Sequence, residues 1–81
     1  MNEVFIIGRI IENIEFDFIY RKSKTSIAKT KVELLNKSII EIYGYDEIAD
    51  YMYRNIEKNN VIAVEGKMRS DKVEVEWIIE L

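Results

Sequence analysis

The residues of this sequence with the clearest chemical potential are a group of cations and one tyrosine. Positions 21 to 37 carry six Lys or Arg residues and one Glu, a local charge of +5, although the whole chain has a net charge of −3. Ammonium and guanidinium groups neutralise phosphates, and an aromatic ring can stack on a nucleic-acid base. We therefore predict a binding surface drawn from these cations, from three more near the C-terminal end and from the tyrosine: Lys22, Lys24, Lys29, Lys31, Lys37, Tyr43, Lys67, Arg69 and Lys72. The competing interpretation is that these cations only solvate an exposed loop and strand face.

The composition excludes most catalytic chemistries. The chain has no His and no Cys, which removes the commonest general base, the commonest metal ligand, the thiol nucleophile and any disulfide. Alternating Glu residues near the C-terminal end have the spacing of a solvent-facing strand rather than of a metal site. The sequence thus predicts a protein that is not an enzyme and that holds neither a metal nor a cofactor.

Length and hydropathy predict one small globular domain. The 81 residues are too few for a second core, and a hydrophobic content of 48% is sufficient for a packed one. No apolar run reaches the roughly 18 residues that would span a bilayer, and no basic signal region opens the chain. We expect a single domain over residues 1–81, with no membrane partner and a cytoplasmic location.

Hydrophobic periodicity indicates the elements that must position the cations. β-Branched and aromatic residues predict one long bent strand over 4–11 and 14–20, with Phe16, Phe18 and Tyr20 facing the core. The alternative for Tyr20, near the open end, is stacking on a base. Strict alternation predicts a second strand over 27–35 and a third over 38–43. The two residues between them suit a tight turn in which Asn36 takes a positive φ.

A helical period follows Gly44. Ile48, Met52 and Ile56 recur at the spacing of one helix face, Asp46 is the expected N-cap, and the helix should end by Lys58.

Two further strands are predicted, over 61–68 and 73–81, joined by a turn at 69–72. Val73, Val75, Trp77 and Ile79 share one parity, which predicts that Trp77 lies in the core or at an interface. The order β-β-β-α-β-β is that of the five-stranded OB-fold Greek-key barrel, whose second and third strands form the usual oligonucleotide surface.

The first predicted strand is apolar on both of its faces, whereas a strand of a small barrel needs only one apolar face. We therefore expect a second copy of the chain to cover the other face, in a dimer through this strand or in a tetramer. The alternative is that the helix or a loop covers it. The predicted interface residues are Val4, Phe5, Ile7, Arg9 and Ile11.

Four segments resemble bacterial single-stranded DNA-binding proteins. Residues 2–10 (NEVFIIGRI) resemble the family's N-x-V-x-L-x-G-x-L opening, and residues 27–32 (IAKTKV) its V-A-N-F-T-L strand. Residues 42–44 (IYG), followed by the helix at 49–54, resemble its L-F-G segment and helix, and residues 64–69 (VEGKMR) its V-E-G-x-L-R strand. The matches extend over residues 2 to 69 and keep the family's order.

The resemblance implies that Tyr43 occupies the position of a family aromatic that stacks on bases, whereas Lys37 falls where the family often has a stacking Trp. The family's long loops are reduced here to residues 36–37 and 69–72. The family also has an acidic tail, which recruits replication and repair proteins. The printed sequence has no such segment after Leu81, and we expect that the tail is either absent or trimmed.

We therefore expect non-catalytic, largely sequence-independent binding of single-stranded DNA in replication, recombination or repair. The alternative is an OB-fold assembly module that resembles primosomal proteins, with a protein as its main partner and weak or vestigial DNA binding. The short loops and the acidic charge balance favour this alternative.

Overall fold

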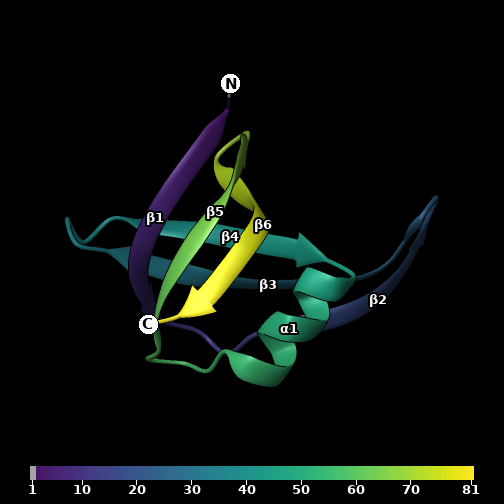
Figure 1. Ribbon diagram of the computed structural model, residues 1–81, viewed down its shortest axis with the longest axis horizontal. Helices are drawn as coiled ribbons and strands as arrows, with labels where there is room; N and C mark the ends of the chain where they lie inside the picture. Colours follow the sequence, from purple (N-terminus) through teal and green to yellow (C-terminus); the bar gives the residue numbers. More distant parts are fainter. Residues whose placement is uncertain (1) are drawn as a thin grey trace.

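A computed structural model describes residues 2–81 as six strands and one helix (Figure 1). The elements, in chain order, are β1 (Glu3–Ile10), β2 (Glu15–Arg21), β3 (Lys24–Leu34), β4 (Ile39–Tyr45), α1 (Glu47–Asn55), β5 (Val61–Arg69) and β6 (Lys72–Glu80). Within this part of the chain, no helix is long and apolar enough to cross a membrane.

The strands form one closed barrel. Their hydrogen-bonded order is β1-β5-β6-β4-β3-β2, and β1 also pairs with β3 through Gly8, Arg9 and Ile10, which closes a ring of five strands. A Cβ atom at Gly8 would lie 2.5 Å from the carbonyl oxygen of Glu33, so a glycine is required where the two strands meet. This is the predicted OB fold, with α1 between β4 and β5.

The predicted long first strand is divided in two at residues 11–14. Here the amide of Ile11 donates to the carbonyl of Lys31 at 3.0 Å, and the buried hydroxyl of Thr30 donates to the carbonyl of Glu12 at 2.8 Å. β1 and β2 therefore pair with opposite ends of β3, and the bend is a complete break rather than a bulge.

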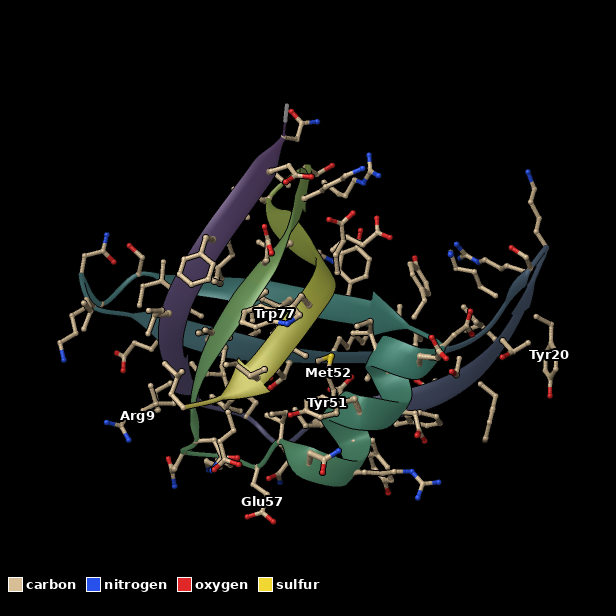
Figure 2. All side chains as sticks on the ribbon, viewed as in Figure 1. Arg9, Tyr20, Tyr51, Met52, Glu57 and Trp77 are labelled. Atoms are coloured by element: carbon tan, nitrogen blue, oxygen red, sulfur yellow. The ribbon has the colours of Figure 1, made fainter. Side chains whose placement is uncertain are left out.

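The core lies inside the ring and is closed at one end by α1. The inward residues of β3 and β4, including Ala28, Val32 and Ile42, are fully buried as the alternation predicted. Ala49 and Met52 of α1 are also fully buried, and Figure 2 shows Met52 directed from the helix toward the barrel. The helical stripe is confirmed, and the chain leaves the helix through Asn59, whose φ is 79°.

A bulge in β6 overturns the predicted parity of this strand. Glu65 pairs with Trp77 whereas Gly66 pairs with Val75, so one extra residue is inserted into β6 between these pairs. Val73 and Val75 face the core as expected, but Ile78 takes the next core position and Trp77 is 42% exposed. Trp77 is therefore not a core residue, and the other alternative, that it lies at an interface, stays a prediction.

β2 and the start of β3 form a hairpin that extends beyond the barrel (Figure 1). β3 begins at Lys24 and not near residue 27, and the turn passes through Lys22, whose φ is 44°. Phe18 and Tyr20 were expected in the core, yet they are 72% and 91% exposed because the hairpin has no layer packed over its end. Figure 2 shows Tyr20 far from the centre of the molecule.

Two expected local conformations are also corrected. In the β3–β4 turn the positive φ, 73°, belongs to Lys37 and not to Asn36, whose side-chain oxygen accepts a hydrogen bond from the amide of Ser38. Asp46 occupies the N-cap position of α1, but its side chain does not cap the helix. Its Oδ1 instead accepts hydrogen bonds from the amides of Thr25 and Ser26, at 2.9 and 3.1 Å, and from the Thr25 hydroxyl. Asp46 therefore fastens the base of the hairpin to the end of β4.

The pH dependence of stability tests this role of Asp46. The hydrogen bond from the Thr25 amide is the largest of the effects that hold the pKa of the Asp46 carboxyl below its ordinary value of 3.8. A lowered folded-state pKa stabilises the fold above the unfolded-state pKa, and this contribution is lost as the pH falls through the folded-state pKa. In Asp46→Asn, an oxygen acceptor remains but the charge does not titrate. We therefore expect the free energy of unfolding, measured with denaturant at a series of pH values, to decline less below about pH 5 than in the wild type.

Asp17→Asn is the matched control, because it removes the same charge from the exposed side of β2, where no hydrogen bond to the carboxylate is present within residues 2–81. An Asp46→Asn profile with the same slope as the wild type would contradict the assignment.

Candidate nucleic-acid interface

The outer face of β3 and β4 brings the central predicted residues together. Lys29 and Lys31 project from β3 on the side opposite the core residues, and Tyr43 projects from β4 on the same side. Lys29 is directly opposite Tyr43 across the strand pair. Strand alternation alone places a cation beside the ring.

The β5–β6 turn completes a hollow around Tyr43. β4 and β6 pair in parallel, with Glu41 opposite Lys72 and Tyr43 opposite Glu74, so the turn that precedes β6 lies beside the ring. The resulting hollow has a volume of about 500 Å³. We call it the Tyr43 hollow, and its lining residues are Ile27, Lys29, Glu41, Tyr43, Arg69, Ser70, Asp71 and Lys72. Four of the nine predicted binding residues therefore share one depression.

Tyr43 itself is partly buried in this hollow. Burial, then the Glu74 carboxylate and then Tyr45 raise the pKa of the Tyr43 phenol above its ordinary value of 10.0, while Arg69 opposes the shift. The phenol is therefore uncharged near neutral pH, so it does not repel a phosphate. Tyr45 follows on the same side of β4 and meets Tyr43 edge to face, with ring centroids 5.7 Å apart.

Each cation on this surface has a carboxylate partner. The ion pairs are Lys29–Glu15 at 4.0 Å, Lys31–Glu12 at 3.5 Å, Lys67–Glu76 at 3.6 Å, Arg69–Glu74 at 3.0 Å and Lys72–Glu41 at 3.4 Å. The cation side chains of all five pairs are at least 40% exposed, whereas Glu74 and Glu41 are half-buried. The surface is consequently balanced in charge, not strongly basic as the local count over residues 21–37 suggested. Exposed pairs of this kind contribute at most about 1 kcal/mol, so a phosphate can compete for the cations.

The other predicted cations lie at two separate places. Lys22 and Lys24 belong to the β2–β3 hairpin, where Lys24 Nζ is 4.9 Å from the centroid of the Tyr45 ring. Lys37 is in the β3–β4 turn, near Gly8 and Val61. About six residues of strand, or roughly 20 Å, separate Lys37 from Tyr43 along β4. The structure thus does not bring Lys37 together with the Tyr43 hollow.

Two residues beside this surface, Tyr45 and Arg21, were not among the predicted binding residues. Tyr45 follows Tyr43 by two residues, so continuing the strand alternation past Gly44 would have placed it on the same side. Arg21 ends β2 and lines a second depression of about 470 Å³ together with Lys22, Ser23, Lys24 and Tyr45. We call this depression the hairpin hollow.

Acidic residues are numerous on this surface, but they do not form a metal centre. Within residues 2–81, no group of three or more Asp or Glu side chains is arranged to hold a metal ion. Their observed contacts are with the neighbouring cations.

A second outer surface is apolar and belongs to β1, β5 and β6. Cross-strand pairing places Phe5 in one row with Trp77, and Ile7 in the next row with Ile79. These four residues and Val61, which we call the apolar face, are between 36% and 61% exposed. Trp77 lies over β5 and β6 in Figure 2.

Not all of the predicted interface residues face outward. Phe5, Ile7 and Arg9 are exposed, Ile11 is half-buried beyond the end of β1, and Val4 packs partly against the core. Arg9 donates to the carbonyl oxygen of Asn59 at 3.3 Å.

Comparison with solved structures finds the same fold in single-stranded DNA-binding proteins. The SSB domain of a Synechococcus protein superposes with a TM-score of 0.85 at 15% sequence identity, covering 96% of this chain and 93% of that chain. The single-stranded DNA-binding protein of Thermus aquaticus gives 0.83 at 17% identity, covering 100% of this chain and 40% of that chain. The small single-stranded DNA-binding protein of Streptomyces coelicolor gives 0.78 at 8% identity, covering 98% and 91%.

This chain therefore spans less than half of the Thermus aquaticus protein, and identities of 8% to 17% establish the fold alone. No protein-family model and no curated protein matches the sequence.

Proposed function

We propose that this chain binds single-stranded DNA through the outer face of β3 and β4, with little preference for sequence and without catalysis. The observation that carries the proposal is the Tyr43 hollow, where one aromatic ring is surrounded by Lys29, Arg69 and Lys72. A ring stacks on any base, and cations follow the phosphates, which is the usual mode of sequence-independent binding to single strands. The fold shared with single-stranded DNA-binding proteins supports the same function. Replication, recombination and repair are the processes that expose such strands.

The geometry also predicts how binding proceeds. A phosphate that approaches Arg69 or Lys72 competes with the carboxylate of Glu74 or Glu41 for the positive charge. Because this carboxylate stays close to the anionic strand, it offsets part of the attraction between the cation and the phosphate. We therefore expect base stacking to contribute more to affinity here than phosphate contacts do.

An assembly module with weak DNA binding is the second candidate. The charge balance of the β3–β4 surface and the five exposed residues of the apolar face favour it. The two candidates differ in their response to nucleic acid. Titration of oligo-dT, oligo-U and a duplex at two salt concentrations separates them, because an assembly module should bind none of the three below about 100 μM.

Replacement of Tyr43 tests the stacking contribution. We expect Tyr43→Ala to weaken binding of oligo-dT by about 1 to 3 kcal/mol, the usual contribution of one stacked base, as measured by fluorescence anisotropy. Tyr43→Phe keeps the ring and should retain most of the affinity. Tyr51→Ala is the control, because Tyr51 lies on α1 and takes no part in the hollow. Equal affinity of Tyr43→Ala and the wild type, with circular dichroism unchanged, would exclude Tyr43 from the site.

Removing one carboxylate tests the competition at the ion pairs. In Glu74→Gln, an oxygen acceptor remains beside Arg69, but the negative charge 3.0 Å from its Nε is removed, so Arg69 attracts a phosphate more strongly. We expect tighter binding of oligo-dT at low salt and a plot of log affinity against log salt that is steeper by about 0.7, the value for one added contact to a single strand. Glu57→Gln makes the same change of charge in the loop after α1 and should alter neither quantity (Figure 2). A Glu74→Gln variant with the affinity and slope of Glu57→Gln would contradict this account.

We further propose that a second copy of the chain associates along β1. Residues 3–7 of β1 pair with β5 on one side only, since β3 pairs only with residues 8–10. An apolar groove of about 420 Å³ follows this open edge, lined by Phe5, Ile6, Ile7, Leu34, Leu35 and Asn36. Leu35 is 93% exposed. An open strand edge beside exposed apolar side chains is a template for pairing with an identical strand.

Sedimentation velocity tests this association. We expect the wild type to sediment as a dimer or a larger oligomer, and Phe5→Glu or Ile7→Glu to shift it toward the monomer, because the charge would be buried at the contact. Tyr20→Glu introduces the same group at an exposed aromatic position far from β1 and should leave the distribution unchanged. A monomeric wild type at concentrations up to about 1 mM would overturn the proposal.

A further inference from the structure

The hairpin hollow differs from the Tyr43 hollow in its charge. Its three cations, Arg21, Lys22 and Lys24, have no carboxylate within 4.0 Å among residues 2–81, whereas all three cations of the Tyr43 hollow have one. Asp46 interacts electrostatically with this hollow, because Lys24 is among the causes that lower the pKa of its carboxyl. One carboxylate offsets at most one of the three positive charges, so the hollow keeps a net positive charge.

An aromatic ring accompanies these cations. Tyr45 lines the hairpin hollow, and Lys24 Nζ lies 4.9 Å from the centroid of its ring. The rings of Tyr45 and Tyr43 are 83° apart in orientation, with centroids separated by 5.7 Å. Two bases stacked on these rings could not be parallel to each other, so a strand that used both would turn between them.

The two hollows follow each other along β4. Tyr43 lines one and Tyr45 the other, and the two side chains follow each other on the same side of the strand. The hairpin extends beyond the barrel next to this end of β4 (Figure 1), which leaves its cations accessible from solvent. A single-stranded polyanion in the Tyr43 hollow would therefore meet the cations of the hairpin next.

We propose that the hairpin hollow is a second nucleotide subsite, in which Arg21, Lys22 and Lys24 bind phosphate and Tyr45 carries a base. This inference rests on the proposed binding of single-stranded DNA and assigns a different contribution to each hollow. The Tyr43 hollow contributes stacking on a neutralised surface, and the hairpin hollow contributes most of the counterion release. The salt dependence of binding then originates mainly from the hairpin and not from the centre of the β3–β4 surface.

The experiment compares salt slopes for oligo-dT of about 16 nucleotides, the upper range of sites on one OB fold. We expect the double variant Lys22→Gln/Lys24→Gln to flatten the plot of log affinity against log salt by about 1.4, the value for two lost contacts to a single strand. Lys29→Gln/Lys72→Gln removes the same charge from paired cations and should flatten it by less than half as much. Lys58→Gln, in the loop after α1, is the neutral control.

Tyr45 is tested by a pair of variants. Tyr45→Leu should weaken binding about 5- to 150-fold, as expected for one stacked base, whereas Tyr45→Phe should remain within about twofold of the wild type. Thermal unfolding of both variants shows whether a loss of affinity reflects an unfolded protein instead of a lost contact with the base. If Tyr45→Leu is destabilised, the slope of the lysine double variant still decides the inference, because those side chains are exposed and lie outside the core.

The outcomes separate the two proposals. Binding that depends on Tyr43 but has the wild-type slope in Lys22→Gln/Lys24→Gln would overturn the second subsite and leave the proposed function intact. A larger flattening in Lys29→Gln/Lys72→Gln than in the hairpin variant would also overturn it. A wild type that binds no oligo-dT would overturn both.

Discussion

Closure of the barrel at β1 is the constraint on which the remaining structure depends. β1 must pair with β5 along most of its length and with β3 at its end, and only a glycine at position 8 permits this approach. The chain then has to leave the ring at residues 11–14, where Thr30 and Lys31 provide hydrogen bonds to the bend. β2 begins outside the ring of five strands. It pairs with the first part of β3, and the two strands form the projecting hairpin. The same closure leaves half of β1 with an open edge.

The local charge of a surface in this protein depends on which residues the fold brings together and not on the charge of one sequence segment. The excess of cations over residues 21–37 suggested a basic groove, but the fold places the carboxylates of Glu15 and Glu12 beside Lys29 and Lys31. It also places Glu74 and Glu41 beside Arg69 and Lys72, the cations that the β5–β6 turn adds to this surface. Among the predicted binding cations, Lys22 and Lys24 of the hairpin and Lys37 of the β3–β4 turn have no carboxylate within 4.0 Å in residues 2–81. The sheet thus carries an aromatic ring among paired cations at its centre, and unpaired cations in the projecting hairpin.

The sequence predicted those features that depend on periodicity over several residues. The barrel order, the inward faces of β3 and β4 and the apolar stripe of α1 follow from alternation or helical spacing, and the structure confirms them. The errors arise where one inserted residue shifts the inward–outward alternation of a strand, or where a side chain binds a partner that is distant in sequence. An inserted residue in β6 moves Trp77 outward and Ile78 inward, and the carboxylate of Asp46 is used by Thr25 rather than by the helix that follows it. Neither event leaves a local signal in the sequence.

The candidate site also has a part that local pattern predicted and a part that it did not. Lys29 and Tyr43 were placed together correctly because they occupy facing positions of two adjacent strands, and strand registry is determined by the short turn between them. The prediction that Lys37 lies with them was wrong. Lys37 is in the turn between β3 and β4, and the Tyr43 hollow is at the other end of these strands. The contribution of the β5–β6 turn depends on the parallel pairing of β4 with β6, a contact between segments about thirty residues apart in the chain. A candidate site assembled from one local strand pair and one distant turn can therefore be only half predicted from local pattern, and the unpredicted half adds the ion pairs of Arg69 and Lys72.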